Sequence, residues 1–264
     1  MNAFPRRSDG RRIVIKTPRE IDLMRKAGEI SAMTLDFAGS IIRPGVNTWE
    51  INREIGGFFK RHGAVPSFRG LYGFPGNACI SINHELIHGI PSRKRYLREG
   101  DIVSIDLGAY KDGFHGDTAA TFACGGFDKL PEGVKKLIRV TEQSLADGIS
   151  KAYAGNRVGD VSFAIQSCVE NSGYFLPEDF HGHGVGKDLH EDPNVPNIGK
   201  AGRGPRLVPG MTIAIEPMVH STTKKYRILN DDWTVVEGNG NLAAHCEHTV
   251  LITSGEPVVL TKLA

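Results

Sequence analysis

The chain has 264 residues, of which 40% are apolar and 23% charged, as in ordinary globular proteins. Its 32 basic and 30 acidic side chains give a net charge of +2, which argues against a dedicated nucleic-acid-binding protein because such proteins carry a strong basic excess. No apolar run approaches the roughly 18 residues of a membrane helix, and the polar N-terminus has no apolar segment typical of a secretory signal. We therefore expect a cytoplasmic protein with no membrane partner.

The N-terminus is locally basic, with five basic side chains against one acid in residues 1–16. We expect a flexible basic tail at residues 1–12 and a single catalytic domain at residues 13–264. The tail is expected to be solvated; the alternative is a contact with anionic RNA, such as a transient contact with the ribosome. The four cysteines are far apart and form no CxxC motif, which is typical of reduced cytosolic thiols rather than a disulfide framework.

Helix signals occur in two pairs along the chain. The motif TPRE at residues 17–20 is a capping box with proline at the first helical position, followed by apolar residues at helical spacing. A second helix is predicted from about Thr48, with Gly63 just beyond its end. Similar spacing predicts further helices around residues 134–145 and 161–169.

Strand signals follow each pair of helices. Residues 78–82, 101–110 and 114–122 are predicted strands, and the last two flank an Asp-Gly turn at residues 112–113. A later strand is predicted at residues 212–217, with more strands from there to the end of the chain.

The order of helices and strands repeats at an offset of 110 residues. The matched pairs are Gly45 with Gly155, Ile51 with Val161, Ile55 with Ile165, Phe59 with Val169, Gly63 with Gly173, Leu97 with Leu207, Gly100 with Gly210, Ile105 with Ile215, and Asp106 with Glu216. Each match alone is expected by chance, and amphipathic segments always align somewhere. Nine at one offset predict two related α+β halves that face each other, with Asp106 and Glu216 in equivalent places.

The predicted hairpin brings two acids together. A two-residue turn at residues 112–113 places Gly108 opposite Asp117, so Asp106 becomes a diagonal cross-strand neighbour of Asp117. Two adjacent carboxylates repel each other unless they bind cations or share a proton. The alternative is an exposed hairpin with solvated acids, which the apolar neighbours Val103 and Ile105 make less attractive.

Three other segments offer ligands for a cation. Glu216 follows an apolar run and Glu247 begins one, and a buried carboxylate in such a run is costly without a partner. His183 lies between two glycines. Each residue alone could be a surface or satisfied core residue. Together with Asp106 and Asp117 they form four carboxylates and one imidazole, which suit Mn, Fe, Co or Zn rather than a structural zinc site. Four carboxylates suit two cations about 3.5–4 Å apart, bridged by carboxylates and a water.

Such a pair of cations predicts hydrolysis, because it makes hydroxide available near neutral pH and polarises a carbonyl. A glutamate ligand could carry the proton of the bridging water. His88 and His190 are candidate donors to a developing oxyanion. Spacing alone does not rank the other histidines that could approach the site, which are His84, His115, His181, His245 and His248.

Five segments in order resemble the signatures of type I methionine aminopeptidases: CISINHELIHGIP, VSIDLGAYKDGFHGDT, HGHGVGKDLHEDP, IAIEPM and HCEHTV. The resemblance runs in register from about Ile13 to Leu260. It implies the α+β "pita-bread" fold, with two pseudo-symmetric halves and a central antiparallel sheet covered by helices. It also implies an enzyme that hydrolyses the initiator methionine from nascent proteins when the second residue is small, by attack of a metal-bridging water or hydroxide on the scissile carbonyl.

The resemblance implies roles for individual residues. Asp106, Asp117, His183, Glu216 and Glu247 match the metal ligands, with Asp117 and Glu247 as the bridging carboxylates. Glu216 matches the ligand that also handles the water's proton, His88 the histidine near the scissile amide, and His190 the one that contacts the substrate carbonyl. The methionine pocket of the family maps to Phe68, Leu71, Phe74, Cys79, Leu189 and Trp233, residues that would otherwise be interpreted as plain core.

The implied cofactors are two divalent ions from among Co, Mn, Fe, Zn and Ni, and the implied partners are the N-termini of nascent polypeptides. One active site per chain suits a monomer. Asn83 matches a residue of a monovalent-cation site, but Ala243 replaces a serine there, so this site stays open. The pocket also departs from many bacterial members, which have cysteine at Phe68, tyrosine at Leu71 and an aromatic residue at Leu189.

Two other functions remain as alternatives. An X-Pro aminopeptidase or prolidase-like hydrolase would carry a large N-terminal domain, which the 16 residues before the capping box do not supply. A non-catalytic pita-bread binding module would have lost metal ligands, whereas this chain keeps all five.

Overall fold

The computed structural model describes residues 13–263; the tail predicted at residues 1–12 and Ala264 lie outside the described residues. The helices are α1 (Pro18–Ser40), α2 (Thr48–Arg61), α3 (Glu132–Ile149) and α4 (Val158–Asn171), with short 3-10 turns η1 (Leu71–Gly73) and η2 (Phe127–Lys129). The strands are β1 (Val65–Pro66), β2 (Cys79–Ile82), β3 (Glu85–Ile87), β4 (Ile102–Lys111), β5 (Phe114–Ala123), β6 (His181–Gly184), β7 (Glu191–Pro196), β8 (Thr212–Ile215), β9 (Met218–His220), β10 (Tyr226–Ile228), β11 (Val235–Glu237), β12 (Ala243–His245), β13 (Glu247–Leu251) and β14 (Val258–Val259).

The predicted helix starts are confirmed. Thr17 Oγ1 accepts a hydrogen bond from Glu20 N at 3.3 Å, and Glu20 Oε2 accepts one from Thr17 N at 2.9 Å, which completes the capping box of α1. Helix α2 ends before Gly63, whose φ of +62° suits glycine beyond a helix end. Within residues 13–263, no helix has the length and apolar character needed to cross a membrane.

The main sheet is antiparallel and runs through both halves in the order β1-β4-β5-β13-β8-β6-β7, with β2 also paired to β4 and β14 to β13. The β4–β5 hairpin has the predicted register, with Gly108 opposite Asp117. Strand β8 ends at Ile215, earlier than predicted, and Glu216 follows it. Pro217 has no N–H to donate to a sheet, and the chain then enters β9, which pairs with β12 in a separate sheet.

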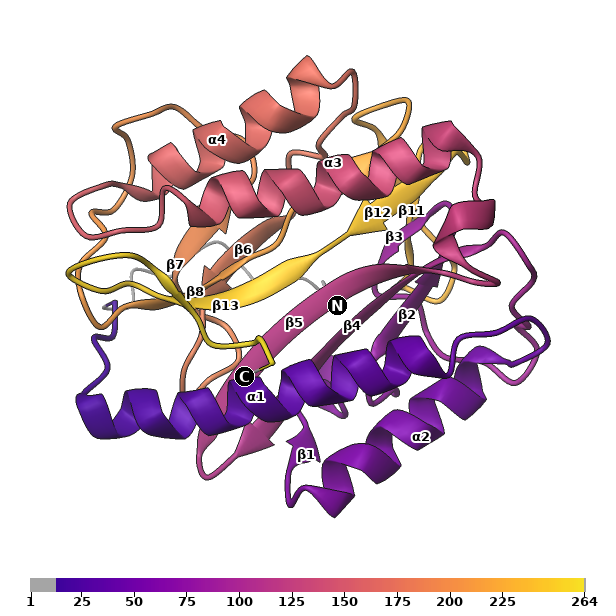
Figure 1. Cartoon of the computed structure of the whole chain (residues 1–264), viewed down its shortest axis with the longest axis horizontal. Coiled ribbons are helices and arrows are strands. Elements are labelled where there is room, and N and C mark those ends of the chain that lie inside the picture. Colours follow the sequence, from indigo (N-terminus) through magenta and orange to yellow (C-terminus); the bar gives the residue numbers. More distant parts are fainter. Residues whose placement is uncertain (1–12, 264) are drawn as a thin grey trace.

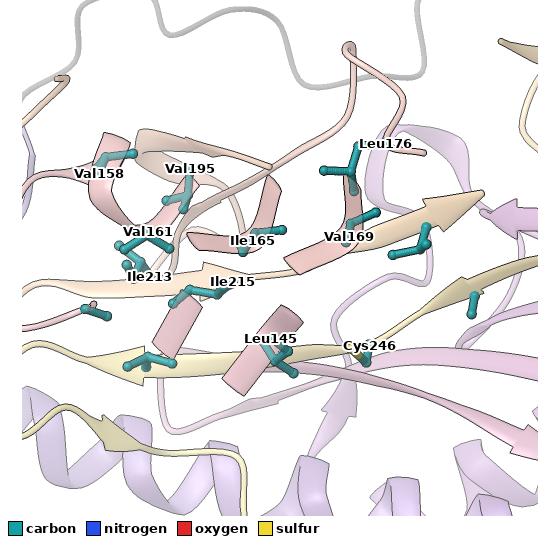
Figure 2. Close-up of a cluster of buried hydrophobic side chains, with 14 of the residues drawn as sticks. Leu145, Val158, Val161, Ile165, Val169, Leu176, Val195, Ile213, Ile215 and Cys246 are labelled. Atoms are coloured by element: carbon teal, nitrogen blue, oxygen red, sulfur yellow. The ribbon is translucent and has the colours of Figure 1, made fainter. Parts of the chain in front are cut away.

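The helices cover one face of the main sheet (Figure 1). Helices α1 and α2 pack on the strands of the first half, where the core includes Ile55, Ile105 and Leu107. Helices α3 and α4 cover the second half, and Figure 2 shows Val161 and Ile165 of α4 close to the side chains of β8. Successive side chains along a strand point to opposite faces of the sheet. The residues between those that pack on the helices therefore point to the face away from the helices.

The predicted repeat is present in the backbone. Gly45 N donates to Leu97 O at 2.8 Å, and 110 residues later Gly155 N donates to Leu207 O at 3.1 Å. Both glycines have a positive φ, of +85° and +100°, so a similar turn precedes α2 and α4. The two halves are thus related in detail, as the α+β pita-bread fold requires.

Candidate active site

The sheet register lines up several site residues on the face away from the helices. Cys79 on β2 pairs with Asp106 on β4, Asp106 pairs with Ala119 on β5, and Ala119 pairs with Glu247 on β13. Directly opposed residues point to the same face of a sheet. Asp117 lies two residues before Ala119 and shares that face, so three carboxylates surround one small side chain.

His183 and Glu216 complete the cluster from the second half. His183 Nε2 lies 3.8 Å from Asp117 Oδ2 and 3.6 Å from Glu216 Oε1. His183 Nδ1 lies 2.8 Å from Gly184 O, a contact in which the carbonyl accepts from Nδ1–H and leaves a lone pair on Nε2. The structure therefore brings together all five residues that the sequence predicts as ligands.

The glycines that flank His183 are needed for close packing. A Cβ at Gly182 would overlap Ala214 O, and a Cβ at Gly184 would overlap Asp192 O. The backbone of β6 therefore lies close to its neighbours, and His183 is held between two strands.

The electrostatics of the cluster favour cations. Burial raises the pKa of Asp117 to about 7, and burial together with the neighbouring carboxylates raises the pKa of Asp106, Glu216 and Glu247 well above the usual range. Asp106 Oδ1, Asp117 Oδ1 and Glu247 Oε1 are buried and have no hydrogen-bond partner among the described residues. Burial lowers the pKa of His183 to about 4, so its imidazole is neutral at pH 7. Oxygen atoms without donors and a neutral imidazole fit divalent metal ions.

His245 is a site residue that sequence spacing did not single out. Its Nε2 lies 3.7 Å from Glu216 Oε2, and neither ring nitrogen has a hydrogen-bond partner within residues 13–263. Donor atoms of Glu216, His245 and Glu247 lie within 4.8 Å of one another, as do those of Asp117, His183 and Glu247. Two such sets that share Glu247 fit a centre with more than one ion.

Other histidines named from the sequence have different surroundings. His115 Nδ1 contacts Ser67 Oγ at 2.8 Å, and His248 Nδ1 contacts Thr261 Oγ1 at 3.0 Å. His84 contributes its backbone carbonyl, which accepts from Glu237 N. The side chains of His115 and His248 thus have polar partners away from the cluster.

His88 and His190 lie at the mouth of the cluster. The His190 ring is perpendicular to that of His183, with centroids 4.3 Å apart. Burial lowers the pKa of His88 to about 4 and, with the nearby histidines, lowers the pKa of His190 well below its usual value. Both rings are therefore neutral at pH 7 and can offer an N–H to a substrate.

The carboxylates line a cavity of about 550 Å³, and the remainder of its wall forms an apolar pocket beside them. It is lined by all six predicted pocket residues, namely Phe68, Leu71, Phe74, Cys79, Leu189 and Trp233. Tyr72, which sequence reasoning missed, also lines it; its ring stacks on His190 at 5.9 Å and 17°. Its φ of +51° is unusual for tyrosine, and only the flanking glycines at 70 and 73 signal the tight turn in the sequence.

A second cavity of about 410 Å³ continues the site on the other side of the histidines. It shares four residues with the apolar pocket, and its lining comprises Ile87, His88, Asp179, Phe180, His181, His183, His190, Glu216 and Met218. Glu216 is thus the carboxylate that lies where the two cavities meet.

Comparisons with known proteins agree with this geometry. Residues 22–254 match metallopeptidase family M24. The chain is 50% identical over 251 residues to a methionine aminopeptidase of Clostridium perfringens, covering 95% of this chain and 99% of that protein. The crystal structure of a methionine aminopeptidase from Thermotoga maritima has a TM-score of 0.92 at 42% identity, covering 95% of this chain and 100% of that one.

A prolidase from Pyrococcus furiosus is more distant. Its TM-score is 0.76 at 26% identity, and the match covers 95% of this chain but 66% of the prolidase. The prolidase thus shares the fold but has additional chain that the aminopeptidase relatives lack. The chain belongs to metallopeptidase family M24 and, within it, to the methionine aminopeptidases.

Proposed function

We propose that this protein is a metal-dependent aminopeptidase that removes the N-terminal methionine of nascent proteins when the second residue is small. The observation that carries the proposal is the contact between an apolar pocket and a buried carboxylate cluster. A long, flexible, apolar side chain suits a pocket lined by Phe68, Phe74 and Trp233. The names of the relatives support the same substrate.

Asp106, Asp117, His183, Glu216 and Glu247 are proposed to hold two divalent ions. The buried carboxylate oxygens without donors, and the lone pair that His183 Nε2 directs at Asp117 and Glu216, support this assignment. Co, Mn, Fe, Zn and Ni all suit such a mixed oxygen and nitrogen set. When bound, such ions polarise a carbonyl and make hydroxide available near neutral pH.

The chain's own residues orient the substrate and move protons. The pocket holds the methionine side chain, so that the first peptide bond lies against the cluster. His190 donates an N–H to the carbonyl oxygen of that bond, and His88 contacts the amide. Glu216 takes the proton of the attacking water at a carboxylate oxygen and passes it to the leaving amine.

The second cavity is proposed to hold the residues after the cleaved bond. His88 and His190 border both cavities, so both lie close to the proposed path of the substrate between them.

Several wider properties belong to the same proposal. Residues 13–264 form one catalytic domain, supported by the pairing of β5 with β13 that joins the two halves. The protein acts as a monomer in the cytoplasm, where nascent chains emerge and its free thiols stay reduced. A transient ribosome contact through residues 1–12 and a monovalent cation near Asn83 remain hypotheses.

The decisive experiment incubates the purified protein with Met-Ala-Ser in Mn²⁺ or Co²⁺ and detects free methionine by mass spectrometry. We expect release with metal, no release with a chelator, and no cleavage of Ala-Pro-Ser. Cleavage of Ala-Pro-Ser instead would replace the proposal by an X-Pro hydrolase. Metal binding without cleavage of either peptide would favour a non-catalytic module.

A further inference from the structure

A short loop between β6 and β7 carries two residues into the cleft. Residues 186–190, called here the cleft loop, include Leu189 in the apolar pocket and His190 beside the carboxylates. The loop closes on itself through a hydrogen bond from Gly186 N to Asp188 O at 3.0 Å. His115 N also donates to Gly186 O at 2.9 Å, which ties the loop to β5.

The carboxylate of Glu191 accepts hydrogen bonds from the backbone of the cleft loop. Glu191 Oε1 accepts from Lys187 N at 2.8 Å and from Asp188 N at 3.4 Å. Gly186 packs against the same carboxylate, because a Cβ at that position would overlap it. The position of this one carboxylate therefore sets the path of the backbone that leads to Leu189 and His190.

Lys16 holds that carboxylate from the other half of the chain. Its Nζ lies 2.5 Å from Glu191 Oε2, and the two side chains are 3% and 9% exposed. The backbone of Lys16 is fixed as well, since its N–H donates to Gly210 O at 2.8 Å. Figure 1 shows the segment before α1 rising from the first half toward β7 and β8.

A buried ion pair of this kind is sensitive to the loss of either partner. Removing Lys16 would leave the Glu191 carboxylate buried without a counter-charge, which strongly disfavours the present arrangement. A second ion pair on the same loop differs: Lys187 Nζ lies 3.2 Å from Glu20 Oε1, but the Lys187 side chain is 70% exposed. Exposed pairs contribute little, so this one serves as a matched control.

We propose that Lys16 is a positioning residue which, through Glu191, fixes the cleft loop and thereby places Leu189 and His190 for catalysis. This inference rests on the proposed aminopeptidase activity. Lys16 touches neither the substrate pocket nor the carboxylate cluster, so its effect passes through the loop. A displacement of about 1 Å in a catalytic group costs up to about 100-fold in rate, which sets the scale of the expected effect.

The test compares Lys16→Met with Lys187→Met. We expect Lys16→Met to lower kcat/KM by about 10- to 100-fold with unchanged metal content, and Lys187→Met to match the wild type. Hydrogen exchange gives a readout independent of activity. The amides of residues 187 and 188 should exchange faster in Lys16→Met than in Lys187→Met, with and without metal, while Lys16→Arg keeps most of the protection.

A double-mutant cycle with Glu191→Gln completes the test. The double variant removes both charges, so its loss should be smaller than the product of the two single losses. The inference would be overturned if the losses in kcat/KM of the two single variants simply multiply in the double variant. It would also be overturned if Lys16→Met has the kinetics and the amide exchange of the wild type. If Lys16→Met does not fold, Glu191→Gln replaces it as the disruptive variant, with Lys16→Arg and Lys187→Met as the variants that should keep the loop in place. An inactive wild type would refute the proposed function, and the exchange data would then still decide whether Lys16 fixes the loop.

Discussion

Single residues reveal the function because they stand where packing alone would not place them. Glu247 begins a buried strand and lies with Asp106 and Asp117 around one alanine. Each additional buried carboxylate raises the cost of ionising the others, and no cationic side chain forms an ion pair with them within residues 13–263. Such a cluster is explained by cations supplied from solution.

Glu247 is expected to be indispensable for metal. Glu247→Ala should abolish aminopeptidase activity together with bound metal, because Glu247 belongs to both possible three-residue ligand sets. Plasma mass spectrometry of the purified variant measures the metal directly. Glu170→Ala, on the surface of α4, is the control and should bind metal as the wild type does. Full metal content in Glu247→Ala would remove this residue from the ligand set.

His190 is expected to affect rate rather than metal. His190→Ala should lower kcat about 100- to 1,000-fold, the usual loss for one oxyanion donor, with metal content unchanged. His190→Gln keeps an N–H and should lose less. Single-turnover kinetics alongside metal analysis distinguish the roles. Loss of metal from His190→Ala would make it a ligand and contradict its assignment as a donor.

Phe68 tests the substrate pocket. Phe68→Ala removes most of one wall, and an apolar contact of about 1.5–3 kcal/mol corresponds to a loss of about 10- to 100-fold in kcat/KM for a methionine substrate. The control is Phe163→Ala on α4, which removes a half-exposed ring elsewhere and should change kinetics little. Equal kinetics for the two variants would show that this pocket does not bind the methionine side chain.

At the scale of elements, the close approach of α1 to β5 fixes the sheet that carries the acids. A Cβ at Gly116 would lie 2.6 Å from Gly28 Cα, so helix and strand meet backbone to backbone. Ser31 Oγ reinforces the contact by donating to Gly116 O at 2.8 Å. Asp117 follows Gly116 directly, so the same contact that packs the helix also places a site residue.

Gly116→Ala should therefore destabilise the protein. The added methyl group must displace the helix backbone, which typically costs about 1–3 kcal/mol of unfolding free energy. Gly133→Ala is the matched control, because a Cβ at this helical position meets nothing within 4 Å and alanine favours helix over glycine by up to about 1 kcal/mol. Urea unfolding measures both changes; equal stability of the two variants would contradict the close-packing argument.

At the scale of the whole molecule, the sequence predicts those features of the fold and the site that depend on neighbouring residues in the chain. The Asp-Gly turn determines the hairpin register that joins Asp106 to Asp117, and the repeat predicts two halves with a shared turn. The approach of His245 to Glu216 depends instead on how separate sheets meet, and nothing in its spacing distinguishes it from His248. The link between Lys16 and Glu191 joins residues 175 positions apart, so no local pattern could reveal it.

The charge cluster should make the stability of the whole molecule depend on pH and metal. Burial raises the pKa of Asp117 from its ordinary 3.8 to about 7 in the folded, metal-free protein. Between these values the folded state keeps a proton that the unfolded state has lost, so the contribution of Asp117 to stability falls as pH rises from about 4 to about 7. Buried neutral histidines act in the opposite direction, because they lack a proton that the unfolded chain binds.

The difference in stability between two proteins reports Asp117 together with its effect on the neighbouring carboxylates. In chelator, the unfolding free energy of the wild type minus that of Asp117→Asn should fall as pH rises from about 4 to about 7, since the amide does not titrate. Adding Mn²⁺ to the wild type should raise the Tm strongly at pH 7.5 and little at pH 5, because protons compete with metal for the carboxylates. A wild-type response to Mn²⁺ that is independent of pH would show that the ions do not bind through these acids.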